Sequence, residues 1–287
     1  MVVQNGWVIA ERYAQGIQPD MPLIGWSMSK SVTHALIGRA IREGLLDPGK
    51  PPKVPEWSDP QEPRQRISLD QLLRMNSGLA FDESTGTLNS DLVRMLTQEA
   101  DMAGFAASQP LIKKPGKKWS YSSGTTNILS RILRHTIDDD QRYWSFPRQA
   151  LFEPLGMTTA VLESDNSGTL VGSSLAWASG RDWARFGQLY LDHGRWNGKQ
   201  LLPANWVERA RTASRGSKGE YGAHWWLSRR KSRRDLPKDS FSAEGYQGQL
   251  LLVAPSHRAV IVRLGQTPKK AGFDANAFGA DVLSALR

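Results

Sequence analysis

Strand-forming segments stand at the two ends of this 287-residue chain, and helix-forming segments fill most of the stretch between them. Near the start, Val2–Val3 and Trp7–Tyr13 flank Asn5-Gly6, the strongest short hairpin signal that a sequence offers. Beyond residue 220, four more segments have the character of strands: Tyr221–Leu227, Phe241–Ala243, Gln249–Val253 and Ala259–Leu264. We therefore expect both ends of the chain to share one antiparallel sheet, with a helical lobe inserted between them.

The middle of the chain is expected to be mostly α-helical. Apolar residues recur at three- and four-residue spacing over residues 27–43, and Gly44 follows, which predicts a buried helix. Ser68 and Gln71 form a capping box ahead of a short helix that Gly78 is expected to end. Further helices are expected over residues 123–136, 142–153 and 181–193, and from about Ala275. The expected fold class is therefore α+β, with an antiparallel sheet flanked by helices.

The length and composition suit a single globular domain. Hydrophobic residues make up 39% of the chain and charged residues 23%, which is ordinary for a soluble protein. We expect a sheet lobe over about 1–45 and 160–287 and a helical lobe over about 46–159. No apolar run approaches membrane-spanning length, and the start of the chain lacks the pattern of a signal peptide. The chain as given is expected to be soluble, and cytoplasmic, or periplasmic if an upstream signal has been lost.

The residue types also exclude several kinds of site. The absence of cysteine excludes disulfides, thiolate zinc sites and a cysteine nucleophile. The five histidines are scattered without a metal-binding spacing, so neither a metal nor another cofactor is expected. The net charge of +9 could attract nucleic acid, anionic lipid or an acidic substrate. Formal charge bears on encounter and solubility rather than on chemistry, and no nucleic-acid partner is expected.

The segment Ser27-Met28-Ser29-Lys30 opens the first predicted helix. A spacing of three places Ser27 and Lys30 on one helical face, and the helix N-terminus offers partial positive charge to a developing oxyanion. A lysine stripped of water can act as a neutral base toward a serine hydroxyl, which makes Ser27 a candidate nucleophile. The same spacing recurs in Ser228-Arg229-Arg230-Lys231, but no apolar helix follows it, and a solvated loop is expected there.

Tyr121-Ser122-Ser123-Gly124 opens another predicted helix. A tyrosine whose pKa is lowered by a neighbouring ammonium can take a serine's proton and return it to a leaving group. Taken alone, a tyrosine before a helix is more often a packing residue. His34 lies one turn beyond Lys30 on the same face, so a Ser-His pair is an alternative, although the chain has no Gly-x-Ser-x-Gly elbow.

The order of these motifs resembles the serine β-lactamase and penicillin-binding-protein superfamily, most closely its class C-like esterases and 6-aminohexanoate-dimer hydrolases. The resemblance extends over nearly the whole chain. It rests on Gly25 to Val32, Leu72 to Leu79, Tyr121 to Gly124, Pro154 to Met157, Arg181 to Gly187 and Gly245 to Gln249. It implies a β-lactamase/transpeptidase-like fold, a single catalytic domain over residues 1–287, and a serine hydrolase that cleaves small-molecule esters or linear amides.

The resemblance also implies roles for individual residues. Ser27 would be the acylated nucleophile, Lys30 its hydrogen-bonded activator, and Tyr121 the base that activates the hydrolytic water. The backbone N–H groups of Ser27 and Tyr246 would form the oxyanion hole. Ser123 would hold Lys30 or the substrate.

The chain departs from the family pattern at three places. Where the penicillin-recognising members carry a Lys-Thr-Gly-like strand that holds a substrate carboxylate, this chain has Ala243-Glu244-Gly245. We expect Glu244 and Gly245 to border the substrate, and Glu244 to repel anionic substrates unless an Arg or Lys neutralises it. Ser123 stands where asparagine is common. The usual helix before the hairpin is missing, so either the chain is truncated or its C-terminal helix covers that face of the sheet alone.

Four tryptophans, Trp26, Trp119, Trp225 and Trp226, could line an apolar acyl pocket, with Trp26 and Trp225 the candidates for substrate contact, although core packing accounts for any single one at least as well.

Two other functions stay open. One is a true β-lactamase or D-Ala-D-Ala carboxypeptidase. The other is a catalytically inactive scaffold or a module that binds anionic polymers through clusters of basic residues. Exposed loops are the simpler explanation of those clusters. The basic residues of that module would be Arg229, Arg230, Lys231, Arg233, Arg234, Lys113, Lys114, Lys117 and Lys118.

Overall fold

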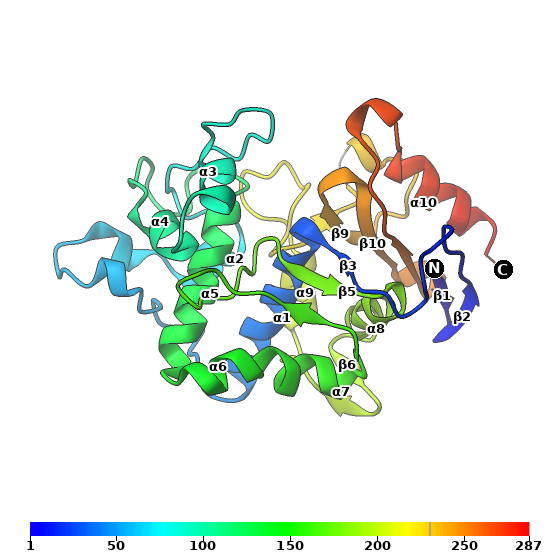
Figure 1. Ribbon diagram of the computed structural model, residues 1–287, viewed down its shortest axis with the longest axis horizontal. Coiled ribbons are helices and arrows are strands. Elements are labelled where there is room, and N and C mark those ends of the chain that lie inside the picture. The colour runs from blue at the N-terminus through cyan, green and yellow to red at the C-terminus, as the bar shows by residue number, and fades with distance from the viewer. Residues whose placement is uncertain (230, 287) are drawn as a thin grey trace.

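The computed structural model describes residues 1–229 and 231–286, and its main sheet has six antiparallel strands (Figure 1). The order across the sheet is β2-β1-β11-β10-β9-β8. The strands are β1 (Val2–Gln4), β2 (Trp7–Ala10), β8 (Trp226–Leu227), β9 (Phe241–Gly245), β10 (Gln249–Ala254) and β11 (Ala259–Arg263). The prediction that the two ends of the chain share one antiparallel sheet is therefore confirmed.

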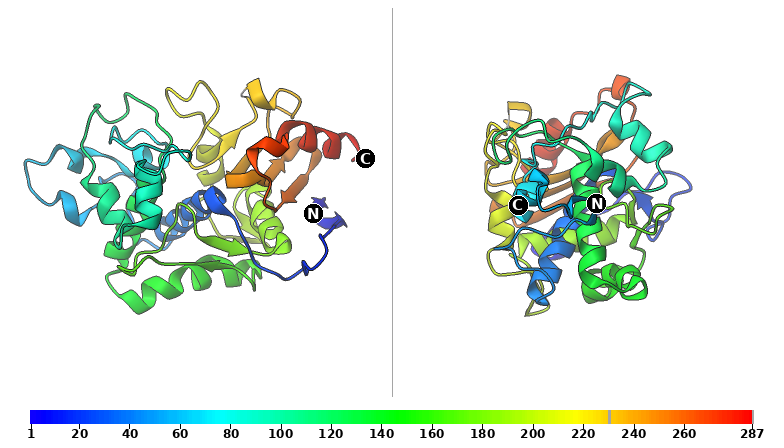
Figure 2. Two further views of the ribbon diagram at one scale, coloured as in Figure 1. Left: turned by 45° about the horizontal axis from the view of Figure 1, so that its top comes forward. Right: turned by 90° about the vertical axis from the view of Figure 1, so that its left-hand side faces the viewer.

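The N-terminal hairpin places β1 between β2 and β11. Asn5 and Gly6 both have positive φ, 52° and 81°, as the predicted Asn-Gly turn requires. β1 pairs with β11 in a register that sets Val2 opposite Ile261, and the Met1 amino group donates to the Val262 carbonyl. Figures 1 and 2 show the two chain ends at the same end of the molecule.

Helices pack on both faces of this sheet. On the inner face lies α8 (Gly180–Leu191). This helix packs closely against the sheet, since a Cβ on Gly187 would lie 2.5 Å from the Val260 side chain. The outer face carries α10 (Ala275–Ser284), whose Leu283 joins a buried cluster with Leu252 and other side chains of the sheet. Figure 2 shows α10 on the outer side. The expected α+β arrangement, a sheet flanked by helices, is confirmed.

The helical part lies at the other side of the molecule, with α1 running between the two parts (Figure 1). Its helices are α1 (Ser29–Arg42), α2 (Leu69–Leu73), α3 (Asp91–Thr97), α4 (Met102–Ser108), α5 (Ser123–Ile137), α6 (Asp140–Pro147) and α7 (Glu153–Leu155); α9 is Trp206–Arg211. The remaining strands form two small sheets: β3 (Leu23–Ile24), β4 (Val161–Leu162) and β5 (Ala176–Ala178), and then β6 (Arg195–Trp196) with β7 (Lys199–Gln200).

Several predicted boundaries differ from the structure for local reasons. The capping box of Ser68 and Gln71 is present, but α2 ends at Leu73 rather than at Gly78, because Met75 already takes a positive φ of 61°. The helix predicted over 142–153 begins at Asp140 and passes through a π-helical turn, Arg148–Phe152, into α7. The strand predicted over Tyr221–Leu227 contracts to β8 because a turn occupies its first half.

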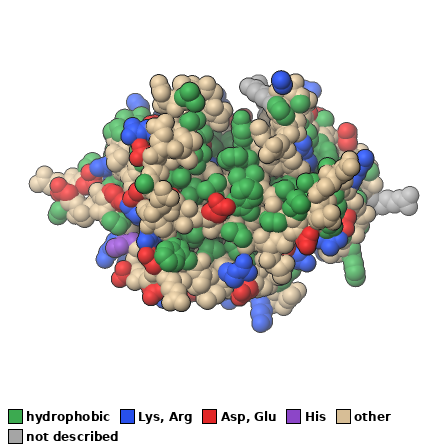
Figure 3. Space-filling view, viewed as in Figure 1, with side chains coloured by type: hydrophobic (Ala, Val, Ile, Leu, Met, Phe, Trp, Pro, Cys, Tyr) green, Lys and Arg blue, Asp and Glu red, His purple; other side chains and the backbone are tan. Residues whose placement is uncertain are grey.

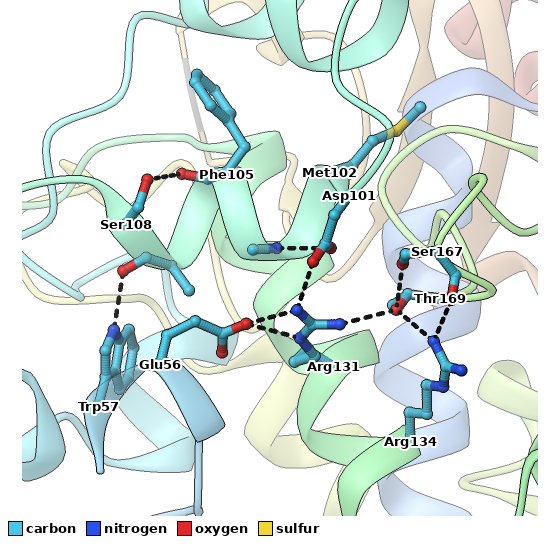
Figure 4. Close-up of polar contacts among 12 residues, drawn as sticks. Glu56, Trp57, Asp101, Met102, Phe105, Ser108, Arg131, Arg134, Ser167 and Thr169 are labelled. Atoms are coloured by element: carbon cyan, nitrogen blue, oxygen red, sulfur yellow. Dashed lines mark hydrogen bonds and ion pairs between the residues drawn. The ribbon is translucent and has the colours of Figure 1, made fainter. Parts of the chain in front are cut away.

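Two arginines of α5 fasten the helical part together (Figure 4). The Arg131 guanidinium lies 2.5 Å from Glu56 and 2.5 Å from Asp101, on two different segments. One turn later, Arg134 pairs with Asp140 at 2.7 Å and donates to the Ser167 carbonyl. These ion pairs tie α5 to three surrounding segments, and they fix the helix that begins at Ser123, directly after Tyr121 and Ser122.

Candidate active site

Ser27 lies in a 3₁₀ turn, Trp26–Met28, immediately before α1 rather than in the α-helix itself. Two hydrogen bonds hold this turn to β5: Gly25 N–H donates to the Ala176 carbonyl at 2.8 Å, and Ala176 N–H donates to Ser29 Oγ at 2.9 Å. Trp26 has a φ of 48°, an unfavourable conformation for a bulky residue that persists only where its surroundings enforce it. Ser27 is half-buried, and this turn holds it at the start of α1.

Lys30 is 1% exposed and is surrounded by oxygen atoms. Its Nζ donates to Ser27 Oγ at 3.0 Å, to Ser123 Oγ at 2.9 Å and to the Ser173 carbonyl at 3.0 Å. These three acceptors match the three N–H groups of an ammonium. Burial lowers the pKa of Lys30 to about 8, against the opposite influence of the Glu83 charge. A lysine in this position loses its proton near neutral pH, far more readily than one in water.

Lys30 Nζ lies 4.9 Å from the centre of the Tyr121 ring, and the Ser27 side chain is close enough to the phenol to exert a lowering influence on its pKa. The structure therefore brings the three predicted catalytic side chains together. It does not give Tyr121 the lowered pKa that was expected. Burial raises the pKa of Tyr121 strongly, and the negative charges of Glu83 and Glu244 raise it further, so the phenol stays protonated at neutral pH.

Tyr121 is held by other aromatic rings. Its ring stacks on Trp226, with centroids 5.3 Å apart and planes 27° apart, and meets Tyr221 edge-on at 5.7 Å. Trp119 contacts both of these neighbours. Such packing leaves the tyrosine ring few alternative orientations beside Lys30.

Two residues that the sequence did not reveal also belong to this group. The Glu83 carboxylate accepts from Ser123 Oγ at 2.5 Å and from Ser123 N–H at 2.7 Å, and burial raises its pKa. The Ser173 carbonyl accepts from Lys30, and Ser173 N–H donates to Asn127 Oδ1 at 3.1 Å. Both residues lie in loops far from Ser27 in sequence and in no motif, so their proximity could not be read from spacing.

The end of β9 lies against the turn that carries Ser27. A Cβ on Gly245 would lie 2.2 Å from the Gly25 carbonyl oxygen, so the two backbones are in direct contact at this point. The next residue, Tyr246, meets Trp26 edge-on, with ring centroids 5.8 Å apart. The backbone segments that were expected to form the oxyanion hole are therefore neighbours, and Trp26 lies at the site.

An arginine neutralises Glu244. From the sequence, Glu244 was expected to repel anionic substrates unless an Arg or Lys neutralised it. Arg233 Nη2 lies 2.9 Å from Glu244 Oε2, and Ser242 Oγ donates to Oε1 at 2.7 Å. Arg233 and Ser228 are buried, whereas Arg229 and Arg234 are exposed, so only part of the basic segment is the solvated loop that was expected. Arg230, also assigned to that segment, lies outside the described residues.

The structure corrects the expectation for Trp225. This side chain has no exposed surface and packs in the core against Phe186, Tyr190 and Phe241, so it cannot contact a substrate. The neighbouring Trp226 is the one that faces Tyr121. In a strand, consecutive side chains point to opposite faces, which separates the two indoles.

His34 is likewise a core residue. Its Nδ1 lies 2.7 Å from the Tyr190 hydroxyl, and its ring stacks on Trp206 with centroids 4.7 Å apart. These contacts place His34 in the packing between α1, α8 and α9, and the alternative of a Ser-His pair has no support.

The space-filling view shows a hollow between the two parts of the molecule, opening at the top above the start of α1, with hydrophobic side chains gathered below it (Figure 3).

The loop that leads to Tyr121 carries four exposed lysines, Lys113, Lys114, Lys117 and Lys118. Among the residues that the structure describes, no helix is long and apolar enough to cross a membrane.

Comparison with known proteins identifies the family of the chain. The protein-family model named Beta-lactamase matches residues 1–285 of the chain. The 6-aminohexanoate-dimer hydrolase of Paenarthrobacter ureafaciens is 25% identical over 93% of this chain and 72% of its own length. Among solved structures, EstCE1, a hydrolase with promiscuous acyltransferase activity, matches with a TM-score of 0.74 at 14% identity, covering 99% of this chain and 92% of that one.

A family VIII carboxylesterase matches with a TM-score of 0.69 at 13% identity, covering 92% of this chain and 82% of that one. At these identities the two solved structures show a shared fold, while the family match extends over almost the entire chain. The chain belongs to the β-lactamase family and has the fold of its hydrolases. The expected membership of this superfamily is confirmed.

Proposed function

We propose that this protein is a serine hydrolase that cleaves esters or linear amides through an acyl-enzyme on Ser27. One observation carries the proposal: Lys30 Nζ lies 3.0 Å from Ser27 Oγ, and burial lowers the pKa of that amine to about 8. An appreciable fraction of the amine is then neutral between pH 7 and 8, and a neutral amine within hydrogen-bonding distance can accept the serine proton.

In acylation, Ser27 Oγ attacks the substrate carbonyl while its proton passes to Lys30. The resulting oxyanion is stabilised by the backbone N–H groups of Ser27 and Tyr246, together with the partial positive charge at the start of α1. As the intermediate collapses, the bond to the leaving group breaks and the protonated Tyr121 donates its proton to that group. The products of this step are the Ser27 ester, a Lys30 ammonium and a Tyr121 phenolate.

Deacylation reverses the proton movements. The Tyr121 phenolate, whose raised pKa makes it a strong base, takes a proton from a water molecule that attacks the acyl carbonyl. The Lys30 ammonium returns its proton to Ser27 Oγ as the ester bond breaks. The carboxylic acid leaves, and all three groups regain their starting protonation states. In this scheme Lys30 is the base of the first half-reaction and Tyr121 is the base of the second.

The charges around the site favour a neutral substrate. Lys30 is balanced by Glu83, and Arg233 is balanced by Glu244, so neither of these two described cations is left unmatched to bind a substrate carboxylate. Glu244 and Gly245 on β9 would then border the acyl group without holding an anion. The related 6-aminohexanoate-dimer hydrolase and carboxylesterase bear names of amide and ester hydrolases, which agrees with this substrate class.

Covalent labelling tests the proposal directly. A fluorophosphonate is incubated with the wild type, with Ser27→Ala and with Ser228→Ala, and the peptides are mapped by mass spectrometry. We expect the phosphonyl group on Ser27 in the wild type and in Ser228→Ala, which removes the serine of the other Ser-x-x-Lys segment, and none on Ser27→Ala. A wild type without label on Ser27 would refute the proposal.

Parallel assays separate the candidate substrates. A short-chain p-nitrophenyl ester is expected to be hydrolysed by the wild type and not by Ser27→Ala, and a chromogenic cephalosporin much more slowly. Faster turnover of the cephalosporin than of the ester would instead support a β-lactamase.

A further inference from the structure

We propose that Glu83 is a positioning residue which, through the Ser123 hydroxyl, fixes both the location and the charge of Lys30. This inference rests on the proposed function, because it assigns a role in the Ser27 reaction. Glu83 has no place in the Ser-Lys-Tyr scheme itself, and it contacts neither Ser27 nor Lys30 by a direct hydrogen bond that the structure shows. Its influence on the nucleophile passes through one intervening side chain.

The direction of each hydrogen bond follows from the number of protons available. The Ser123 hydroxyl has one hydrogen, and the carboxylate of Glu83, 2.5 Å away, can only accept it. Ser123 Oγ must then accept from Lys30 Nζ at 2.9 Å. The order of donation is therefore Lys30 to Ser123 to Glu83. Without the carboxylate, the Ser123 hydroxyl could rotate and donate elsewhere, and Lys30 would lose a defined acceptor.

The second carboxylate oxygen makes this arrangement rigid. Glu83 Oε2 accepts from the Ser123 backbone N–H at 2.7 Å, so one side chain receives two hydrogen bonds from one residue. Ser123 is the first residue of α5, which Ser122 caps through the Thr125 N–H. Because the carboxylate is held to this helix at two points, the Ser123 hydroxyl has a single orientation available.

Charge gives Glu83 a second effect on Lys30. The groups that face Lys30 are Tyr121 ahead of α5, His224 from the segment before β8, and Glu83; the Glu244–Arg233 pair lies beyond Tyr121. Of these, the Glu83 carboxylate raises the pKa of Lys30 and so opposes the effect of burial. Removing that charge therefore lowers the pKa of Lys30, and a larger fraction of the amine is neutral at a given pH below 8.

The competing explanation is that Glu83 only stabilises the start of α5. Any carboxylate close to a helix N-terminus stabilises that helix through its negative charge, whether or not it is bonded to Ser123. That explanation predicts a change in thermal stability and no change in the pH dependence of catalysis, so the pH profile distinguishes the two roles.

The experiment measures kcat/KM for a p-nitrophenyl ester from pH 5 to 10 in the wild type, Glu83→Gln and Glu83→Asp. For Glu83→Gln, which removes the charge and keeps the size, we expect the rising limb of the profile to move to lower pH by about one unit, the smaller end of the effect of a neighbouring charge. Glu83→Asp keeps the charge but withdraws it by one methylene. We expect its limb to stay at the wild-type pH, with kcat/KM reduced about tenfold by misplacement of Lys30.

The outcomes separate the two proposals. If Ser27 is labelled normally in Glu83→Gln and the limb does not move, the role of Glu83 is refuted while the Ser27 hydrolase stands. If the wild type shows no label on Ser27, the proposed function itself fails. If Glu83→Gln does not fold, Glu83→Asp decides the matter, because wild-type kcat/KM in that variant would overturn the positioning role.

Discussion

Replacement of Gly245 by alanine should disable the site while leaving the fold intact. A Cβ at this position would lie 2.2 Å from the Gly25 carbonyl oxygen and 2.9 Å from Gln249 Cβ, whereas ordinary contacts begin at 3.4 Å. The first contact therefore demands a separation of about 1.2 Å between β9 and the turn before Ser27. The Gly25 carbonyl is a backbone group, so it cannot move aside as the end of a flexible side chain could.

That separation acts on the proposed oxyanion hole. Gly245 precedes Tyr246 and Gly25 lies two residues before Ser27, so the two backbone N–H groups move apart with the strand and the turn. A misplacement of about 1 Å, or loss of one oxyanion donor, lowers turnover about 10²-fold. We expect Gly245→Ala to lose kcat/KM by about that factor, while overpacking costs about 1–3 kcal/mol of the free energy of unfolding.

The assay is hydrolysis of a p-nitrophenyl ester, with circular dichroism and urea unfolding to verify the fold. Gly180→Ala is the matched control, because a Cβ there meets nothing within 4 Å and should leave both activity and stability close to the wild type. A folded Gly245→Ala enzyme with activity within threefold of the wild type would refute the reasoning that the contact between β9 and the Ser27 turn sets the geometry.

Three further predictions concern pH, specificity and the core. Because neutral Lys30 is the base and its pKa is about 8, kcat/KM should rise with pH and level off above that value; a profile flat from pH 6 to 9 would contradict this role. Glu244→Gln removes the carboxylate that pairs with Arg233, so KM for an ester bearing a carboxylate should fall about tenfold relative to a neutral ester, and an unchanged ratio would show that the pair does not set specificity. Trp225→Ala should lower the free energy of unfolding by about 3–5 kcal/mol in urea titrations, whereas a loss below about 1 kcal/mol would argue against its place in the core.

The sequence predicted the parts of the fold that local patterns encode. The Asn5-Gly6 turn, the capping box at Ser68 and the continuous apolar runs of β10 and β11 each carry their own signal, and each element is present. Element ends were less predictable. The short strand β8 is defined by pairing with β9, a contact between segments that no local pattern specifies.

The candidate site divides in the same way. Ser27 and Lys30 are three residues apart where the 3₁₀ turn runs directly into α1, so their contact follows from helical geometry. Glu83 reaches the site through a loop, and only the folded chain brings it to Ser123. Trp225 and Trp226 are adjacent residues of the same type, and which one faces Tyr121 depends on the orientation of β8 in the sheet. The expected fall in the Tyr121 pKa also failed for a tertiary reason, because burial and the carboxylates of Glu83 and Glu244 raise that pKa.

The pairing of β1 with β11 has a consequence for how the protein is made. Met1 and Val262 are hydrogen-bonded although 261 positions separate them. At a synthesis rate of about 5–20 residues per second, the first strand waits about 13–52 s for its partner to be translated. During that interval the hairpin of Trp7, Val8 and Ile9, which stays largely exposed even after folding, has no sheet to join. Nascent chains of this protein are therefore expected to need protection by a chaperone on the ribosome more than the finished molecule does.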